Sequence, residues 1–576
     1  MKIEIAKTAG FCMGVRRAVE LVLDTPNKYK GPIYTFGPLI HNPQVLALLE
    51  EKGIGVLDHI PENGSGTVLI RAHGVPPEIK IRLTEAGFDV IDATCPRVIK
   101  VQAIIRKHAA QGFASIIVGD ADHAEVIGLL GYADGRGHVV ASLQDLEQLP
   151  VFEKAIIVAQ TTQNQRLFSS VMAWIEKCRP QYQIFNTICD STTKRQLEVR
   201  RLAETSEAVV VVGGRSSGNT QRLAEIASRT GKPTFHIEDA DELLEQAVGR
   251  LNRVAITAGA STPHWIIRRV YRRLEQLMVK KGRRWREKIY SLQRGLLLTN
   301  IYVAVGAAAL SYTSLRLQGI GDSFPYVFIA LLYVLSMHIL NNLTGRKSDR
   351  YNDPQRAAFY LRNEKPLGAL AVLAGGVGLV LALPLGGLPF LVLLLMSVTG
   401  LSYNLTILPR RVRWGKVRRI KDIPGAKTLL ISLAWGVVAA VFPALAQTGR
   451  FNLATVVVFL CMTFLVFVRT AFFDILDMQG DRIVGKETIP LLLGEKRSYR
   501  LLDSLLAATI ALLLAASLLG WIASLGIVLV VCPLFLFLVM GAYRRGAMLP
   551  GIRLEFLIET QFVLAGALSL AAAAVA

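Results

Sequence analysis

Ala9-Gly10-Phe11-Cys12-Met13-Gly14 is the first of three cysteine-containing segments that decide the fold of the N-terminal half of the chain. The second segment is Asp92-Ala93-Thr94-Cys95-Pro96, and the third is Asn186-Thr187-Ile188-Cys189-Asp190. Each cysteine follows a short β-like run and precedes a helix-like stretch, and the gaps between the cysteines are 83 and 94 residues. This spacing predicts three similar α/β units, each of which delivers one thiolate to a shared centre.

The number of thiolates limits what the shared centre can hold. Structural zinc sites use close cysteine pairs and four ligands, whereas three lone thiolates suit an iron–sulfur cubane with one iron left open. The alternative is three unrelated buried thiols, because a free cysteine is often a small core residue. Cys178, Cys461 and Cys532 lie in helical or apolar segments and are interpreted as packing residues. Six cysteines in 576 residues do not form a disulfide framework, so we expect a reducing compartment.

The second half of the chain is far more apolar than the first. Nine apolar blocks follow residue 295, and each is about long enough to cross ~30 Å of hydrocarbon as a helix. They lie near residues 296–315, 324–343, 367–383, 388–408, 426–446, 453–472, 501–520, 524–541 and 556–576. The sequence therefore predicts an all-α membrane domain of about nine transmembrane helices.

Charge gives this membrane domain a direction. Alternate connectors between the blocks hold 29 Lys and Arg and 11 Asp and Glu, and so carry +18 of the formal net charge of +21. Because basic loops stay in the cytoplasm, we expect a multi-pass inner or cell membrane protein whose soluble half is cytoplasmic. The positive charge then reports membrane topology and requires no nucleic acid. Residues 279–294 are expected to form a basic juxtamembrane linker, either solvated or lying on anionic headgroups with Trp285 as an anchor.

Two strand–loop–helix segments in the soluble half are typical of anion binding. Val209–Gly213 leads into Gly214-Arg215-Ser216-Ser217-Gly218-Asn219-Thr220, and Arg253–Thr257 leads into Ala258-Gly259-Ala260-Ser261-Thr262-Pro263. Gly and Ser at a helix N-terminus present free backbone N–H groups and hydroxyls, which suit phosphate. Ser and Thr are also ordinary helix caps, so the argument for a diphosphate ligand depends on two such loops in consecutive units.

Three histidines and one carboxyl group extend this pattern. His41, His73 and His123 lie in turn-rich segments after apolar runs, where they suit an anionic substrate and proton transfer. Glu125 lies two residues after His123, so both side chains face the same way in an extended segment. Thr161 ends another strand-like run and is either a hydroxyl contact or a plain helix cap.

Taken together, these motifs resemble the 4-hydroxy-3-methylbut-2-enyl diphosphate reductase family over residues 1–278. This family catalyses the last step of the methylerythritol phosphate route to isoprenoids. The resemblance is carried by residues 9–18, 37–42, 71–75, 92–96, 123–125, 160–162, 189, 217–220 and 257–261. It implies an α/β trefoil of three quasi-equivalent units around a [4Fe–4S] cluster held by Cys12, Cys95 and Cys189. The implied products are isopentenyl and dimethylallyl diphosphate.

The resemblance also assigns roles within the site. It implies that Glu125 supplies protons, that Thr161 orients the substrate hydroxyl, and that electrons come from a ferredoxin or flavodoxin type donor. The implied diphosphate contacts are His41, His73, His123, Ser217, Asn219 and Ser261. Two positions depart from the family pattern: Ala124 stands where Pro is usual, and Gly218 stands where a second Ser is common.

Acidic residues mark the membrane half as well. Asp474, Asp477 and Asp481 lie at i, i+3 and i+7 on one helical face, where clustered carboxylates favour Mg²⁺ and a diphosphate. With Gly485–Gly494 and Lys421–Lys427, residues 295–576 resemble the 4-hydroxybenzoate polyprenyltransferase superfamily of membrane prenyltransferases, which implies a lipophilic prenyl acceptor. The family's first Asp-rich motif is degraded here to Asn341–Asp349, which retains Asn342 and Asp349 but has Gly345 in place of an acid.

These observations predict a reductase domain at 1–278, a basic linker at 279–294 and a membrane prenyltransferase-like domain at 295–576. Two alternatives stay open at this stage. One is a reductase with a catalytically inactive membrane anchor. The other is a different trefoil iron–sulfur enzyme, similar to quinolinate synthase, although the two diphosphate-type loops argue against it.

Overall fold

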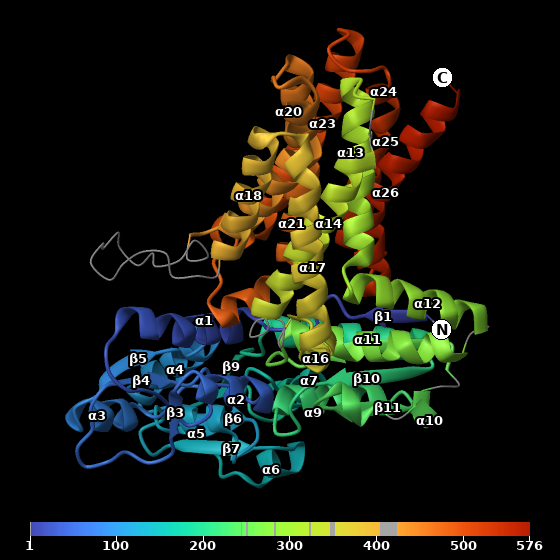
Figure 1. Cartoon of the computed structure of the whole chain (residues 1–576). Helices are drawn as coiled ribbons and strands as arrows, with labels where there is room; N and C mark the ends of the chain where they lie inside the picture. The colour runs from blue at the N-terminus through green and yellow to red at the C-terminus, as the bar shows by residue number, and fades with distance from the viewer. Residues whose placement is uncertain are drawn as a thin grey trace. The chain divides into compact units, whose positions relative to one another are not determined.

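The computed structural model describes residues 2–243, 245–248, 251–281, 284–321, 324–345, 352–403 and 423–575 (Figure 1). The chain divides into two compact units, Met1–Lys281 and Gly282–Ala576, which are described separately. The first is an α/β unit and the second is helical. Asp349, from the degraded Asp-rich motif, lies outside the described residues.

The α/β unit contains three four-stranded sheets, and every pairing between neighbouring strands is parallel. The expectation of three similar α/β units is confirmed. In spatial order, the first sheet is β1 (Lys2–Ile5), β12 (Arg253–Ala258), β10 (Ala208–Val212) and β11 (Thr234–Ile237). The second is β3 (Ile54–Leu57), β2 (Ile33–Phe36), β4 (Thr67–Ile70) and β5 (Asp89–Asp92). The third is β7 (Gly137–Val140), β6 (Ala114–Val118), β8 (Ala155–Ala159) and β9 (Gln183–Phe185).

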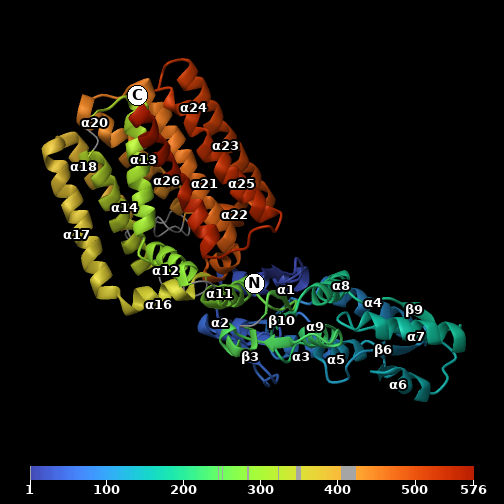
Figure 2. The same cartoon turned by 90° about the vertical axis from the view of Figure 1, so that its right-hand side faces the viewer.

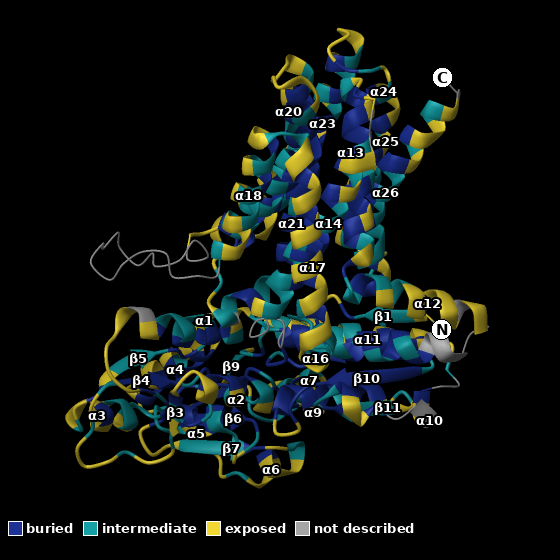
Figure 3. Ribbon diagram, in the orientation of Figure 1, coloured by how far each residue is buried: buried dark blue, intermediate teal, exposed yellow. Residues whose placement is uncertain are grey.

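Sequence composition explains why the central strands are parallel and buried. β4, β6, β8 and β10 are buried at every position, and most of their residues are Val, Ile, Leu or Ala. Strands covered by helices on both faces carry such continuous apolar runs, and β10 appears as a dark ribbon in Figure 3. The buried strands carry few polar residues, such as Thr67 and Ser115, and the polar side chains of interest lie in the loops at the carboxyl edge of each sheet.

Chain topology places the three cysteines equivalently. Cys12, Cys95 and Cys189 follow β1, β5 and β9, and each of these strands is the edge of a different sheet. The first sheet contains strands from both ends of the unit, because Ile5 on β1 pairs in register with Ile256 on β12. The chain therefore begins and ends the unit in one sheet.

The helical unit contains seven helices that are long and apolar enough to cross a membrane, counted among the described residues. Figure 2 shows several of them running side by side. The spans are Phe324–Thr344 (α14), Glu364–Leu385 (α17 with the short η2), Ala426–Thr448 (α19, η4 and α20), Leu453–Arg482 (most of α21, Leu453–Val484), Glu495–Leu518 (α23), Leu525–Arg544 (α24 and α25) and Ile552–Ala574 (most of α26, Ile552–Val575).

The predicted count of nine transmembrane helices is not confirmed. The first block is interrupted between α12 (Arg284–Leu298) and α13 (Ile301–Gln318), which bend by 74° and bring the count to eight at most. Asn300 causes this break with a left-handed backbone (φ 58°), a conformation that Asn tolerates better than most residues. The fourth block contains α18 (Gly387–Ser402), whose 16 residues fall short of the ~20 that a span needs.

Exposed apolar side chains on the long helices fit a lipid environment. On α17, Val372, Leu373 and Val380 are each more than 60% exposed, and Leu391 and Leu395 on α18 are also exposed. Contiguous apolar surface of this kind is rare on soluble proteins. These helices therefore present to their surroundings the side chains that hydrocarbon favours.

Candidate active site

The three cysteines each cap the N-terminus of a helix. Cys12, Cys95 and Cys189 precede α1 (Met13–Lys28), α4 (Pro96–Ala109) and α8 (Asp190–Thr205). The Cys12 Sγ accepts a hydrogen bond from the Val15 N–H at 3.5 Å, and backbone N–H groups of Arg97 and Val98 stabilise the Cys95 thiolate. Free N–H groups and the helix dipole at such a position favour negative charge on a nearby ligand or side chain.

The three sulfur atoms also lie close enough to interact. Burial raises the pKa of the Cys95 thiol, and negative charge on Cys12 and Cys189 raises it further. The space around them is tight, since a Cβ atom on Gly14 would lie 2.4 Å from the Cys95 Sγ. Three mutually repelling thiolates need a cationic partner, and an iron–sulfur cubane binds each thiolate at a different iron. The donor set therefore fits a [4Fe–4S] cluster.

The remaining cysteines lie elsewhere. Cys178 ends α7 (Gln165–Cys178) and is half-buried, whereas Cys461 and Cys532 are buried in helices of the second unit.

Arg195 lies beside Cys12 and Cys189. Its guanidinium donates to the backbone oxygens of Gly10 at 2.6 Å and Ala258 at 3.0 Å. Burial lowers the pKa of Arg195, while Cys12 is the first of three nearby groups that raise it.

The two central strands of each sheet deliver the other predicted residues. His41 follows β2, His73 follows β4 and His123 follows β6, while Thr161, Ser217 and Ser261 follow β8, β10 and β12. Carboxyl ends of parallel strands are the usual position of ligand sites in α/β proteins. Edge strands therefore deliver the cysteines, and central strands deliver the polar side chains.

The structure brings the three histidines together. The ring centroids of His41 and His73 are 4.6 Å apart, and that of His123 lies 5.6 Å from His41 and 5.4 Å from His73. One ring nitrogen from each lies within 4.8 Å of the others, so the trio has the reach to hold a metal ion. Arg71 also lies near enough to lower the pKa of all three histidines. A cationic neighbour disfavours a metal ion and favours an anion.

The protonation state of the histidines follows from burial. Burial is the main cause that lowers the pKa of His41, lowers that of His73 well below its usual value, and brings that of His123 to about 4. His123 Nδ1 accepts a hydrogen bond from the Glu125 N–H at 3.1 Å, which leaves Nε2 as the protonated nitrogen. At neutral pH the trio therefore consists of neutral hydrogen-bond donors.

Several buried polar atoms around the trio lack partners among the described residues. They are His41 Nε2, His73 Nδ1 and Asn219 Nδ2. Asn219 and Thr220 lie in the first turn of α9 (Gly218–Ser228), which Ser217 caps. The Ser261 hydroxyl donates to the His41 backbone oxygen at 3.0 Å. Buried polar groups without partners are costly, so this cradle is arranged for an anionic ligand.

Glu125 is the most deeply buried acid of the site. Its side chain accepts two hydrogen bonds from Thr161, from the backbone N–H at 2.6 Å and from the hydroxyl at 2.8 Å. Burial raises the pKa of Glu125 to about 7, and the Thr161 bonds oppose that rise. A carboxyl group with a pKa near the working pH is suited to deliver a proton.

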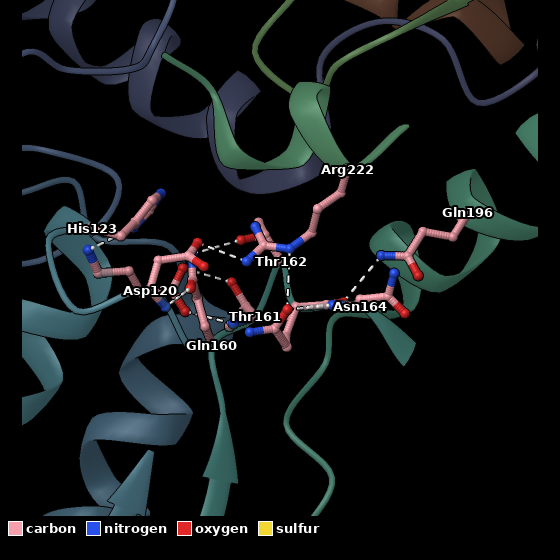
Figure 4. A network of polar contacts seen from close by, with 10 residues as sticks. Asp120, His123, Gln160, Thr161, Thr162, Asn164, Gln196 and Arg222 are labelled. Atoms are coloured by element: carbon pink, nitrogen blue, oxygen red, sulfur yellow. Dashed lines mark hydrogen bonds and ion pairs between the residues drawn. The ribbon is translucent and has the colours of Figure 1, made fainter. Parts of the chain in front are cut away.

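Sequence reasoning missed a second layer of residues, drawn in Figure 4. Arg222 on α9 pairs with Asp120 at 2.6 Å and donates to the Gln163 side chain at 3.1 Å. Gln160 accepts from the Asp120 N–H at 3.0 Å and donates to the Thr162 hydroxyl at 3.0 Å. These contacts tie β6, β8 and α9 together around Glu125. A helical Arg and a loop Asp carry no sequence signal until the fold joins them.

The second unit places its Asp residues differently. Asp474 and Asp481 are buried on α21, whereas Asp477 is half-buried. Asp474 accepts from the Thr428 hydroxyl at 2.6 Å and lies 3.7 Å from the Lys427 ammonium. Asp481 accepts from the Asn352 amide at 2.8 Å and lies 3.6 Å from the Lys486 ammonium. Sequence reasoning missed Asn352, whose partner is 129 residues away.

These two centres correspond to two known classes of protein. Residues 3–275 match the family model described as LytB protein, and residues 298–548 match the model described as UbiA prenyltransferase family. LytB-family enzymes are iron–sulfur proteins, and UbiA-family enzymes use Mg²⁺. With its long apolar helices, the second half is that of a multi-pass membrane protein.

Individual relatives narrow the first class. The 4-hydroxy-3-methylbut-2-enyl diphosphate reductase of Geobacter sulfurreducens is 42% identical over 281 residues, which cover 49% of this chain and 99% of that protein. The reductase of Aquifex aeolicus is 41% identical over 278 residues, which cover 48% and 96% of the two chains. The chain therefore belongs to the 4-hydroxy-3-methylbut-2-enyl diphosphate reductase family, with a UbiA-family domain fused to its C-terminal side.

A solved structure covers the same half. It is described as (E)-4-hydroxy-3-methyl-but-2-enyl diphosphate reductase, the terminal enzyme of the non-mevalonate pathway. It is 41% identical to this chain, covers 48% of this chain and 100% of its own, and has a TM-score of 0.38.

Proposed function

We propose that residues 1–278 reduce 4-hydroxy-3-methylbut-2-enyl diphosphate to isopentenyl and dimethylallyl diphosphate. The substrate takes up two electrons and two protons, its C–O bond breaks, and the hydroxyl leaves as water. The observation that supports this most directly is the combination of three cysteines at helix N-termini, a buried Glu125–Thr161 pair and an anion cradle.

Within this proposal, the diphosphate binds in the histidine cradle. The neutral rings of His41, His73 and His123 donate to its oxygens, and Ser217, Asn219 and Ser261 add polar contacts at two helix starts. Arg71 adds positive charge nearby. The diphosphate satisfies the polar atoms that otherwise lack partners, which makes binding favourable.

In this proposal Cys12, Cys95 and Cys189 would hold a [4Fe–4S] cluster, which would supply one-electron reduction of the bound substrate. Thr161 orients the substrate hydroxyl. Because a Thr hydroxyl both accepts and donates, protonated Glu125 can donate to Thr161 while Thr161 donates to the departing oxygen. The 2.8 Å contact between Glu125 and Thr161 is already in place for this relay. Electrons come from a ferredoxin or flavodoxin type donor.

We assign residues 279–294 as a basic linker and residues 295–576 as a membrane prenyltransferase-like domain. The basic connectors support a cytoplasmic position for the reductase half. In this domain Asp474, Asp477 and Asp481 bind Mg²⁺ and a prenyl diphosphate, with Asp349 contributing from the first motif. Incubating the purified full chain with radiolabelled dimethylallyl and longer prenyl diphosphates tests this. Transfer of label to a lipid acceptor supports it, whereas no transfer favours an inactive anchor.

A growth experiment tests the reductase proposal. The full chain is expressed in a bacterium whose own essential 4-hydroxy-3-methylbut-2-enyl diphosphate reductase has been depleted. We expect the wild-type chain to restore growth and the Glu125→Gln variant to fail at equal expression. Failure of an abundant, iron-loaded wild-type chain would contradict the proposal.

A further inference from the structure

A reductase whose electrons come from another protein needs a surface close to its cluster where that protein docks. This inference rests on the proposed function, because only an enzyme that receives electrons needs a docking surface for an electron donor. The three cysteines place the cluster at the starts of α1, α4 and α8. The surface around these three helix starts is therefore the shortest route for electrons from outside.

The three helices present the same pair of side-chain types in their first two or three turns. Each exposes one large apolar side chain: Met13 on α1 (64% exposed), Ile99 on α4 (41%) and Leu197 on α8 (60%). Each also exposes a cation: Arg16 on α1, Lys100 on α4 and Lys194 on α8.

Two contacts join the helix starts into one continuous surface. Arg17 on α1 donates to the Thr94 backbone oxygen, next to Cys95, at 3.0 Å. Arg97 at the start of α4 pairs with Asp190 at the start of α8 at 2.6 Å. A Cβ on Gly14 of α1 would also press on the Cys95 sulfur. These contacts hold together the three helix starts that carry the apolar and basic pairs.

The charge of this surface is local. Residues 1–278 contain 33 Lys and Arg against 30 Asp and Glu, so the unit as a whole is nearly neutral. Around the cysteines the balance is different, because Arg16, Lys100 and Lys194 are all exposed. The nearby acids are already engaged: Asp190 pairs with Arg97, and Glu198 accepts hydrogen bonds from Lys7 and Thr8.

We propose that the surface formed by Met13, Arg16, Ile99, Lys100, Lys194 and Leu197, here called the donor surface, docks a small acidic electron-transfer protein. Apolar side chains ringed by charged ones are typical of protein interfaces. A basic patch steers an acidic partner and raises its association rate. The occupant delivers one electron at a time, and two such deliveries match the two electrons that the substrate takes up.

Charge reversal with two different electron sources tests the donor surface. The triple variant Arg16→Glu, Lys100→Glu, Lys194→Glu is made in the full chain and purified without air. Its matched control is Lys107→Glu, Lys154→Glu, Lys232→Glu. Lys107 lies at the far end of α4, and Lys154 and Lys232 precede β8 and β11, at the opposite edges of their sheets. All three control residues are exposed.

With dithionite and methyl viologen we expect both variants to match the wild-type rate within about twofold. With a reduced acidic flavodoxin or ferredoxin, the donor-surface variant should show a KM for the donor raised about 10-fold or more. The control should remain within about twofold. The wild-type rate with the protein donor should also fall as salt rises, and the variant should lose that dependence.

Other outcomes overturn the inference in separable ways. An unchanged KM for the donor, or an equal rise in the control variant, would show that the donor protein does not dock on the donor surface. Neither result would contradict the reductase activity. A defect that appears in nanodiscs of phosphatidylglycerol but not of phosphatidylcholine shows that the surface binds anionic lipid instead. If the wild-type chain shows no turnover with dithionite, that result contradicts the proposed reductase function and not the docking surface.

Discussion

The two polar centres of this chain differ in how far their buried groups are already satisfied. In the α/β unit, His41, His73 and Asn219 keep buried polar atoms that no described residue binds. In the helical unit, Asp474 is engaged by Thr428 and Lys427, and Asp481 by Asn352 and Lys486. Among the described residues, the first centre keeps polar atoms available to a ligand, whereas two carboxylates of the second are already engaged by neighbouring side chains.

This difference has an energetic meaning. An unsatisfied buried polar group costs roughly 1–3 kcal/mol, so several of them persist together where a ligand completes them. Carboxylates held by neighbouring Lys, Thr and Asn side chains are stable without a ligand, and a metal ion must displace those partners. The comparison therefore predicts a preformed site in the first unit and a site that must rearrange in the second.

Removing a cluster ligand should have the largest effect. We expect Cys12→Ser, Cys95→Ser and Cys189→Ser each to lose iron and essentially all reductase activity, because three thiolates are the whole protein ligand set. Iron content and the visible spectrum of anaerobically purified protein measure this. The matched control is Cys178→Ser, and equal iron in all four variants would remove the cluster assignment.

Glu125→Gln should keep iron and substrate binding but lower turnover by about 10²–10⁴-fold. The amide can still accept a hydrogen bond from Thr161 but has no acidic proton to deliver. Single-turnover rates, with substrate affinity measured separately, check this expectation. Turnover within a few-fold of wild type would exclude Glu125 as the proton donor.

Asp474→Asn in the helical unit should lower any prenyl transfer by about 10–100-fold, as expected for damage to a metal site. Asp503→Asn is the control, because Asp503 is a half-buried partner of Arg544 on another helix. Restoring the family pattern with Asn342→Asp and Gly345→Asp should raise activity or tighten Mg²⁺ dependence. A Cβ at Gly345 would lie 2.9 Å from the Asn341 backbone oxygen, so a small shift is needed there.

No transfer by either the native or the restored chain would show that the domain is an anchor. Strong native transfer that restoration weakens would show that the altered first motif is a specialised diphosphate site.

The pH dependence should follow Glu125. Its pKa is about 7 because burial raises it from an ordinary value of 4.5, and a proton donor is active only in its protonated form. kcat/KM should therefore fall about tenfold per pH unit above 7. Thr161→Val removes a hydrogen bond that lowers the pKa, so the descending limb should move to higher pH while the maximal rate falls. If the descending limb of the pH profile does not move in Thr161→Val, that limb does not report the titration of Glu125.

Gly218→Ser should have the smallest effect. It restores the hydroxyl that is common in the family, at a position where a Cβ would lie 2.9 Å from Arg222 Nη1 and 3.6 Å from His123 Cδ2. One added hydrogen bond should lower the KM for the substrate by about 2–10-fold. An unchanged KM would indicate that a backbone N–H already takes that place.

The sequence was sufficient for features that depend on local pattern. Cys12, Cys95 and Cys189 could be assigned to three equivalent units because each follows a strand-like run, and the structure places each after an edge strand. The apolar blocks predicted helices correctly for the same reason. The count of nine spans is not confirmed, because hydropathy registers neither a left-handed residue such as Asn300 nor the short length of α18.

Long-range polar pairing lay beyond the sequence. Asp120 and Arg222 are 102 residues apart, and Asn352 and Asp481 are 129 apart, so only the fold brings them together. The neutral state of the histidines also depends on burial in the folded chain. The difference between the two units therefore depends on contacts and burial that only the folded chain creates.

Anaerobic turnover by the purified full chain tests the central claim most directly. The iron-loaded protein is mixed with 4-hydroxy-3-methylbut-2-enyl diphosphate and dithionite-reduced methyl viologen, and the diphosphates are separated and quantified. We expect the substrate to disappear. Isopentenyl and dimethylallyl diphosphate should appear in a total amount equal to the substrate consumed. Iron-loaded protein that binds the substrate but forms neither product would contradict the central claim.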